Sequence, residues 1–278
     1  MAELATSLRK LFSGEAHKSS EIPVLASYFH MNAEQYALRF KTQSPIRLYY
    51  GPSLLKPAVL DLIARHFDGV ILQTLYGIGD METSLARLQS ARSQSPLGEP
   101  LRKVMLLNAS VSRDGQAARQ HAKRFVSHIV SGWPDDVLKS KNIDPQAIQS
   151  VRQAYAENRG VDYAASLTPD EAVDRLIIAG TPAQCTERIA EMFSLAARDE
   201  FRQIALGVPL GPDIPEVIRS LGLQKSSRHC AGVRTEFAHD SCRFSGAQST
   251  ATDGVVGIIG FRTPLRVSGA RRVGGRRM

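Results

Sequence analysis

The sequence predicts an α/β fold built on a parallel sheet, and three observations support this prediction. First, four short apolar runs have the length of strands, and they lie at residues 46–50, 70–72, 104–111 and 204–206. Second, stretches with the 3.6-residue period of helices separate these runs, and strands that alternate with helices form parallel sheets with right-handed crossovers. Third, the run at 70–72 is apolar at consecutive positions, which is typical of a strand covered on both faces.

The first third of the chain is predicted to begin with one helix. Residues 4–12 have a helical pattern that Ser13-Gly14 ends, and residues 15–45 show no sustained period, so we expect a long connection there. After the strand at 46–50, a helix is predicted to start at Leu54. Its buried face is expected to carry Leu55, Val59, Leu62 and His66, and Asp68-Gly69 is expected to end it.

Two further helices are predicted around the third strand. Asp80 is expected to cap the first of them, with Leu85 and Leu88 on its buried side. Asp114 is expected to cap the second, which residues 132–134 end. The apolar stripe predicted for this second helix contains Ala118, His121, Ala122, Phe125 and Ile129.

Residues 135–166 have no strand pattern and are predicted to form a helical excursion from the alternating order. Two further helix starts are predicted, because residues 168–171 and 181–184 each have the pattern of a capping box with proline at the first helical position. The apolar face of the later helix is expected to carry Cys185, Ile189, Met192 and Ala196. The last strand, at 204–206, is closed by Gly207-Val208-Pro209.

The composition is that of a soluble globular protein, with 43% hydrophobic and 22% charged residues among 278. No apolar run approaches the ~20 residues of a spanning helix, and the polar start MAELATSLRKLF differs from a secretory signal. We therefore expect a cytoplasmic protein with no membrane contact.

The net charge of +8 is concentrated in the last part of the chain. Residues 225–278 hold ten Lys/Arg against three Asp/Glu, which gives +7 and leaves +1 for the rest. A basic tail can bind nucleic acid through phosphates. This tail has no helical pattern and few aromatic residues for base stacking, so we do not expect nucleic-acid binding.

The cysteines do not predict a disulfide framework or a metal site. Cys185 lies on the apolar face of a helix, where a small buried side chain is the expected role. The tail contains four residues of the types that bind zinc, but we attribute their order and spacing to coincidence and predict no metal site there. They are His229, Cys230, His239 and Cys242.

Candidate binding residues follow the strands, at the edge of the sheet where α/β folds bind ligands. Residues 51–53 form either a plain turn or a phosphate seat, since the first turn of a helix carries unpaired N–H groups. Polar or turn-forming residues also end the other strands: Gln73, Thr74, Asn108, Ser110, Gly207 and Pro209. Each of these either contacts a ligand or is simply solvated or bonded to a neighbouring backbone group.

Other polar residues favour structural roles. His121 lies on or beside an apolar stripe, which favours a hydrogen-bonded core histidine over a catalytic base, and His128 lies seven residues further along the same helix. Asp135 and Asp136 stand at a predicted helix start, where carboxylates are stabilising in any case. We therefore assign no catalytic residue.

Several segments resemble the luciferase-like flavin- or deazaflavin-dependent oxidoreductases, and most of all the methylenetetrahydromethanopterin reductase type. The similar segments are DGVILQ, VMLLNASVSRDGQAARQHAKRF, LTPDEAVDRLIIAGTPAQCTERIAEMF and QIALGVPLGPDIPEVIRSLG. The resemblance implies a partial (β/α)8 TIM barrel. Residues 46–222 match its C-terminal half, residues 1–45 form an N-terminal helix and connection, and residues 223–278 form a Gly/Ser/Arg-rich tail. We expect this tail to be disordered, either as an unselected reading frame or as a low-complexity extension.

The resemblance also implies a cofactor, either FMN or the deazaflavin coenzyme F420. Its phosphate and ring would contact six residues: Tyr50, Gly51, Pro52, Ser53, Gln73 and Thr74. The implied activity is hydride transfer, or monooxygenation with a flavin, on a small organic molecule. The alternative is a truncated, non-catalytic half-barrel that acts at most as an oligomerisation module. Two uncovered sheet edges predict a homo-oligomer in either case.

Overall fold

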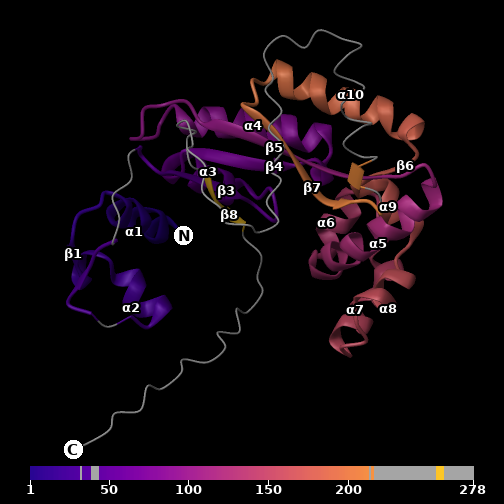
Figure 1. Ribbon diagram of the computed structural model, residues 1–278, viewed down its shortest axis with the longest axis horizontal. Helices are drawn as coiled ribbons and strands as arrows, with labels where there is room; N and C mark the ends of the chain where they lie inside the picture. The colour runs from indigo at the N-terminus through magenta and orange to yellow at the C-terminus, as the bar shows by residue number, and fades with distance from the viewer. Residues whose placement is uncertain (32, 39–43, 213, 216–254, 260–278) are drawn as a thin grey trace, which may run out of the picture.

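The computed structural model describes residues 1–31, 33–38, 44–212, 214–215 and 255–259, and it shows an α/β fold around a parallel sheet (Figure 1). The strands of this sheet are β3 (Arg47–Gly51), β4 (Gly69–Gln73), β5 (Arg102–Val111), β6 (Ile178–Gly180), β7 (Gln203–Leu210) and β8 (Val255–Ile259). These strands form a partial barrel: β4 lies between β3 and β5, and the described strands do not close into a ring.

The helices that follow these strands form the second layer and bury one face of the sheet. They are α3 (Pro57–His66), α4 (Ile78–Arg92), α5 (Gly115–Gly132), α6 (Asp135–Ser140), α7 (Pro145–Ala156), α8 (Val161–Ser166), α9 (Asp170–Leu176) and α10 (Pro182–Arg198), with the 3-10 turn η2 (Thr74–Tyr76). The predicted excursion is confirmed as α6 to α8. Of these, α7 and α8 pack against α5 at one end of the sheet, and α6 contacts α7 (Figure 1).

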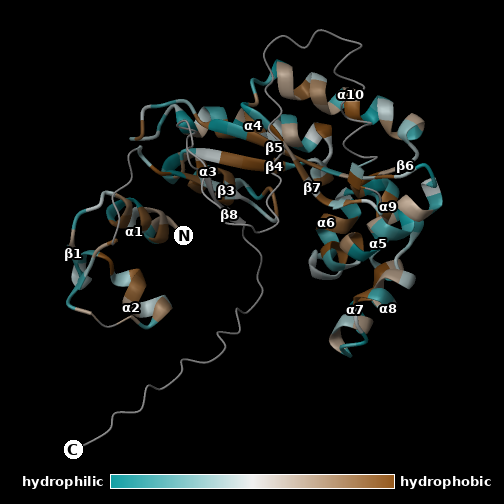
Figure 2. Ribbon diagram, viewed as in Figure 1, coloured by the Kyte–Doolittle hydropathy of each residue, from teal (hydrophilic) through white to brown (hydrophobic). Residues whose placement is uncertain are grey.

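The hydrophobic core lies between the sheet and these helices. Leu48, Leu72 and Leu107 come from three neighbouring strands, and each is fully buried in the same cluster. Figure 2 shows hydrophobic colour on the central strands, whereas helices such as α10 carry both hydrophilic and hydrophobic residues. Amphipathic helices therefore cover an apolar sheet, as the sequence pattern predicted.

Several predicted helix starts are confirmed and others are wrong. Asp114 caps α5 by accepting from the N–H groups of Gln116 and Ala117, and Thr181 forms the predicted capping box of α10 with Gln184. In contrast, α4 begins after Gly77 and not after Asp80. Thr168 caps no helix, because its buried hydroxyl donates to the carbonyl of Ala164. The buried stripe of α5 is also rotated from the predicted one, and it contains Ala118, Ala122, Val126 and Val130.

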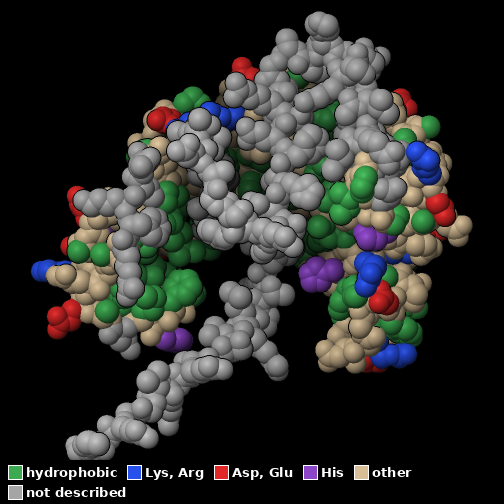
Figure 3. Space-filling model, in the orientation of Figure 1, with side chains coloured by type: hydrophobic (Ala, Val, Ile, Leu, Met, Phe, Trp, Pro, Cys, Tyr) green, Lys and Arg blue, Asp and Glu red, His purple; other side chains and the backbone are tan. Residues whose placement is uncertain are grey.

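The N-terminal region corrects the prediction of a long connection at residues 15–45. It forms a small unit with its own core of Ile22, Val24, Leu25 and Tyr36. Its elements are α1 (Ala2–Phe12), β1 (His17–Lys18), η1 (Ser19–Glu21), α2 (Pro23–Phe29) and β2 (Gln35–Tyr36), and β1 pairs antiparallel with β2. Between α1 and β2 these elements are only two to seven residues long, too short for a period to be counted. Hydrophobic side chains gather on this unit in Figure 3, and Tyr28 and Phe29 are exposed.

One segment of the predicted disordered tail is a strand. Val255–Ile259 pairs with β3 in parallel, from Arg47 opposite Val255 to Gly51 opposite Ile259. Its sequence, VVGII, has four β-branched residues, which favour strands. The rest of residues 223–278, with the tail cysteines and histidines, lies outside the described residues. Among the helices that the structure describes, none is long and apolar enough to cross a membrane.

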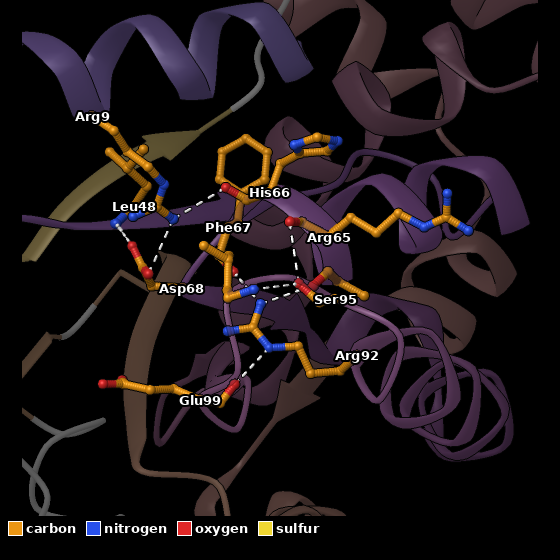
Figure 4. A network of polar contacts seen from close by, with 11 residues as sticks. Arg9, Leu48, Arg65, His66, Phe67, Asp68, Arg92, Ser95 and Glu99 are labelled. Carbon is orange, nitrogen blue, oxygen red and sulfur yellow. Dashed lines mark hydrogen bonds and ion pairs between the residues drawn. The ribbon is translucent and has the colours of Figure 1, made fainter.

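A polar network joins helices and loops at the end of the sheet where the strands begin (Figure 4). The buried guanidinium of Arg92 donates to the carbonyls of Ala64 and Phe67 and to that of Glu99, at 2.7–2.8 Å. Asp68 accepts from the N–H of Leu48 at 2.8 Å and pairs with Arg9 of α1 at 3.0 Å. The network thus fixes α3, α4, α1 and the start of β3 relative to one another.

Candidate functional site

The loop after β3 is longer than the sequence suggested. The expected helix start at Leu54 is wrong: α3 begins at Pro57, with Lys56 as its N-cap residue. Gly51 is the last residue of β3, so Gly51 and Pro52 both lie several residues before the helix. Pro52 is buried and Ser53 is exposed. A Cβ on Gly51 would be 3.7 Å from that of Ile71, so the glycine leaves room but is not required by sterics.

Tyr50 and Tyr76 hold this loop against the core. The ring of Tyr50 packs on Phe67 with centroids 5.2 Å apart. The hydroxyl of Tyr76, in η2, donates to the carbonyl of Pro52, and burial raises the pKa of Tyr76 above its usual value, so the phenol stays a donor. Because Tyr76 comes from the turn after β4, it ties the end of β4 to the loop after β3.

The predicted residues at the end of β4 have different roles. Thr74 is buried, and its Oγ1 accepts the N–H of Asn108 at 2.8 Å, so it joins the end of β4 to β5. Gln73 is half-buried and is the N-cap residue of η2, with no side-chain hydrogen bond to that turn. Thr74 therefore has a structural contact, and the contact of Gln73 with a ligand stays a prediction.

Asn108 is the most informative polar residue at this sheet edge. It is 0% exposed, and its Nδ2 donates to the carbonyl of Val208 in β7 at 2.8 Å. Its Oδ1 has no hydrogen-bond partner in the part of the chain that the structure describes. A buried carbonyl oxygen without a donor is destabilising by about 1–3 kcal/mol, so a ligand N–H or a water is the expected partner.

The remaining strand-end candidates have backbone partners. Ser110 is buried and donates to the carbonyl of Ala118 at 2.7 Å. The Nε2 of His121 lies 3.0 Å from the carbonyl of Pro209, which agrees with a hydrogen-bonded histidine and not with a base. Gly207 approaches Asn108 and Leu106 so closely that a Cβ would lie 2.7 Å from Leu106 Cγ.

Lys56 is a candidate that the sequence analysis missed. It is exposed, lies in the loop after β3 and makes no ion pair with the described residues. Proline is common at the first position of a helix, so the sequence Lys56-Pro57 could have identified Lys56 as the residue just before the helix. The loop therefore offers an ammonium group and the Ser53 hydroxyl at the carboxyl edge of the sheet, a combination suited to an anion.

The other polar candidates have structural roles. Asp135 pairs with Arg152 at 2.7 Å in the first turn of α6, and the ring of His128 contacts that of Tyr155 edge-on. Burial raises the pKa of the Cys185 thiol to about 11, as expected for an unreactive core cysteine. Within the described residues, no group of three His, Cys, Asp or Glu is placed to hold a metal ion.

A groove of about 650 Å³ lies at the opposite end of the strands. It runs between α4, the segment before β5 and the end of α10, and Arg198 pairs across it with Glu82 at 2.6 Å. Its position at the amino ends of β5 and β7 separates it from the residues described above, so we do not assign the cofactor to it.

Comparison with known proteins finds relatives named methylenetetrahydromethanopterin reductase. The chain is 29% identical over 227 residues to the 5,10-methylenetetrahydromethanopterin reductase of Archaeoglobus fulgidus, covering 80% of this chain and 64% of that protein. It is 28% identical over 168 residues to the reductase of the same name from Methanolobus tindarius, covering 60% and 50%. The chain thus spans between half and just under two thirds of the length of these curated relatives.

A solved structure confirms the fold. The coenzyme F420 dependent tetrahydromethanopterin reductase from Methanopyrus kandleri superimposes with a TM-score of 0.57 at 21% identity, covering 78% of this chain and 61% of that one. In addition, residues 1–199 match the family described as luciferase-like monooxygenase. The predicted resemblance is therefore confirmed, and the chain belongs to the luciferase-like monooxygenase family.

Proposed function

We propose that this protein is an oxidoreductase that binds coenzyme F420, or FMN in its place, at the carboxyl edge of its sheet and acts on a small organic substrate. Family membership and the names of the relatives support the reaction class. The observation that carries the proposal is the loop after β3. It combines Ser53 with Lys56, which makes no ion pair with the described residues, at the sheet edge where α/β proteins bind ligands.

The phosphate of either cofactor is expected to bind in this loop. Ser53 supplies a hydroxyl donor and Lys56 supplies a positive charge, so two side chains three residues apart can contact one phosphate. The position just before α3 adds the partial positive charge of a helix start, which stabilises an anion by about 0.3–1 kcal/mol. Pro52, which Tyr76 anchors through its carbonyl, fixes where the loop leaves the sheet.

The ring system of the cofactor is expected to lie across the ends of β4 and β5. The Oδ1 of Asn108, which has no hydrogen-bond partner among the described residues, can accept an N–H such as the one in the pyrimidine part of both rings. One strand, β4, separates β3 from β5, so this acceptor lies about 10 Å from the phosphate loop across the sheet. When bound, F420 supplies the hydride chemistry, and the chain orients the ring and limits the access of water.

The proposal is tested by titrating the purified chain with F420 and with FMN while following the fluorescence of each cofactor. We expect saturable binding of at least one of them. Ser53→Asp places a carboxylate against the phosphate and removes a donor, which should weaken binding ~10- to 100-fold, the equivalent of a charge-assisted hydrogen bond.

A matched control separates this effect from a general change in charge. Glu99→Gln and Ser93→Asp alter the groove at the amino ends of the strands and should leave the affinity unchanged. If the wild-type chain binds neither cofactor, or if Ser53→Asp and Ser93→Asp weaken binding equally, the proposed site is wrong.

A further inference from the structure

The side chain of Lys141 joins the helical excursion to the turn after β4. Lys141 is the C-cap residue of α6, and its Nζ donates to the carbonyl of Tyr76 and pairs with the carboxylate of Asp80. The side chain of Lys141 is 12% exposed, whereas that of Asp80 is 57% exposed. A hydrogen bond from an ammonium group is stronger where water is excluded, so we expect the contact with the carbonyl to fix the turn.

The main chain that carries Lys141 is held in place by the core. The N–H groups of Lys141 and Ile143 both donate to the carbonyl of Leu138, at 3.0 Å. Leu138 and Ile143 are buried in the cluster that they share with the sheet. Asn142, between Lys141 and Ile143, has a φ of 54°, and asparagine adopts this left-handed conformation more readily than most residues. The closed end of α6 therefore gives the ammonium group a fixed position.

Tyr76 connects this contact to the loop after β3. Its carbonyl accepts from Lys141, and its hydroxyl donates to the carbonyl of Pro52. The chain bends directly after Tyr76, where Gly77 has a φ of 79° between η2 and α4. Because this bend separates Tyr76 from the first turn of α4, Lys141 supplies a contact that the helix does not.

We propose that Lys141 is a positioning residue for the loop between β3 and α3, and that it acts through Tyr76 and Pro52. The inference rests on the proposed function, in which this loop binds the phosphate of the cofactor. Ser53 and Lys56 both follow Pro52, so the direction in which the chain leaves Pro52 decides whether they reach the same phosphate. Lys141 thus couples the helical excursion to the affinity of the loop for phosphate.

Direct attraction between the Lys141 ammonium and the phosphate is the competing explanation. The ion pair with Asp80 argues against it, because a neighbouring carboxylate cancels much of the field of the ammonium group. The two explanations also differ in their dependence on salt. Direct attraction weakens as salt screens the charges, whereas the position of the Pro52 carbonyl does not depend on screening. The effect of removing the ammonium group should therefore be similar at low and high ionic strength.

The ratio of the affinities for FMN and riboflavin, measured by calorimetry, tests the inference. Lys141→Met removes the ammonium group and should lower this ratio about three- to tenfold, with the affinity for riboflavin unchanged. Loss of folded protein would affect both ligands equally, so a merely structural role would not change the ratio. Lys141→Arg should restore most of the ratio, because a guanidinium can donate to both oxygen atoms. Lys139→Met, at an exposed position on α6, makes the same change in charge and should have no effect.

Tyr76→Phe tests the second contact and leaves Lys141 in place. It removes the hydroxyl that donates to Pro52 and should lower the ratio to a similar extent, and adding Lys141→Met should cause little further loss, because both variants act through one carbonyl. For a chain that binds only F420, the pair of ligands is F420 and its deazariboflavin core.

Two outcomes of this experiment are distinct. A wild-type chain that binds no cofactor, or that binds both members of a pair equally, would contradict the proposed function and this inference with it. If the wild-type chain prefers the phosphate-bearing ligand, the inference alone is wrong when Lys141→Met or Tyr76→Phe leaves the ratio unchanged, or when Lys139→Met lowers it equally.

Discussion

Replacing Arg92 by methionine is expected to lower the free energy of unfolding by about 3 kcal/mol. The side chain is 8% exposed, and its guanidinium satisfies the carbonyls of Ala64, Phe67 and Glu99 (Figure 4). Methionine keeps much of the apolar contact but donates no hydrogen bond. Each buried carbonyl left without a donor is destabilising by about 1–3 kcal/mol, reduced where water enters from the adjacent groove.

The role of Arg92 is to end α3 and to fix the loop before β5. Ala64 lies in the last turn of α3 and Phe67 is its C-cap residue, so two of the three carbonyls belong to the unpaired end of that helix. Burial lowers the pKa of Arg92, and the guanidinium nevertheless stays protonated near neutral pH. The three contacts therefore persist over the pH range in which the protein would be studied.

Urea unfolding measures this prediction, with Arg87→Met as its control. Arg87 lies on the same helix and pairs with Asp61 at 2.6 Å, but both side chains are substantially exposed. An exposed pair contributes about 0–1 kcal/mol. Equal losses for the two variants would show that the contacts of Arg92 with the carbonyls are not the cause of its effect.

Gly69→Ala is the second change with a large expected effect, a loss of about 3 kcal/mol. A Cβ at this position would lie 2.2 Å from Cε1 of Tyr49 and 2.8 Å from the carbonyl oxygen of Arg102. Tyr49 is 3% exposed, so its ring has little space to move, and the carbonyl belongs to the neighbouring strand. Relief of the clash therefore requires β3, β4 and β5 to separate locally.

Gly79→Ala tests whether the loss at Gly69 comes from crowding and not from glycine chemistry in general. Gly79 lies in the first turn of α4, and a Cβ there would have no neighbour within 4 Å. The alanine should raise the free energy of unfolding by about 0.5–1 kcal/mol, because it restricts the unfolded chain. Thermal unfolding of both variants gives the comparison, and a Gly69→Ala midpoint equal to that of the wild type would contradict the packing.

The parts of the fold that depend on residues close together in the sequence could be predicted. The caps of α5 and α10 were predicted because Asp114 and Thr181 bond within their own first turns. The start of α3 was not, since Pro52 and Pro57 both suit a first helical position and only the packed loop selects the second. Thr168 shows the same limit, because its hydroxyl bonds backwards to α8 once the segment is buried.

The candidate site shows what the sequence could not contain. The order of strands predicted that residues 51–53, Thr74 and Asn108 would share one sheet edge, and the structure places them there. The sequence could not predict the hydrogen bond between Thr74 and the N–H of Asn108. Nor could it predict that the Oδ1 of Asn108 has no donor among the described residues, because both features depend on the register between strands. Lys56 was overlooked for the related reason that the loop after β3 is longer than expected.

The central claim is that the loop between β3 and α3 holds the phosphate of a redox cofactor. It is tested most directly by comparing ligands with and without that phosphate: FMN with riboflavin, which differ only in the phosphate, and F420 with the deazariboflavin core that lacks its phosphate-bearing side chain. Calorimetric titration of the wild-type chain should show at least tenfold tighter binding of a phosphate-bearing ligand than of its partner. Lys56→Gln should reduce this ratio several-fold and leave the affinity for riboflavin unchanged. Equal affinities for both members of each pair, or a ratio that Lys56→Gln does not change, would contradict the account.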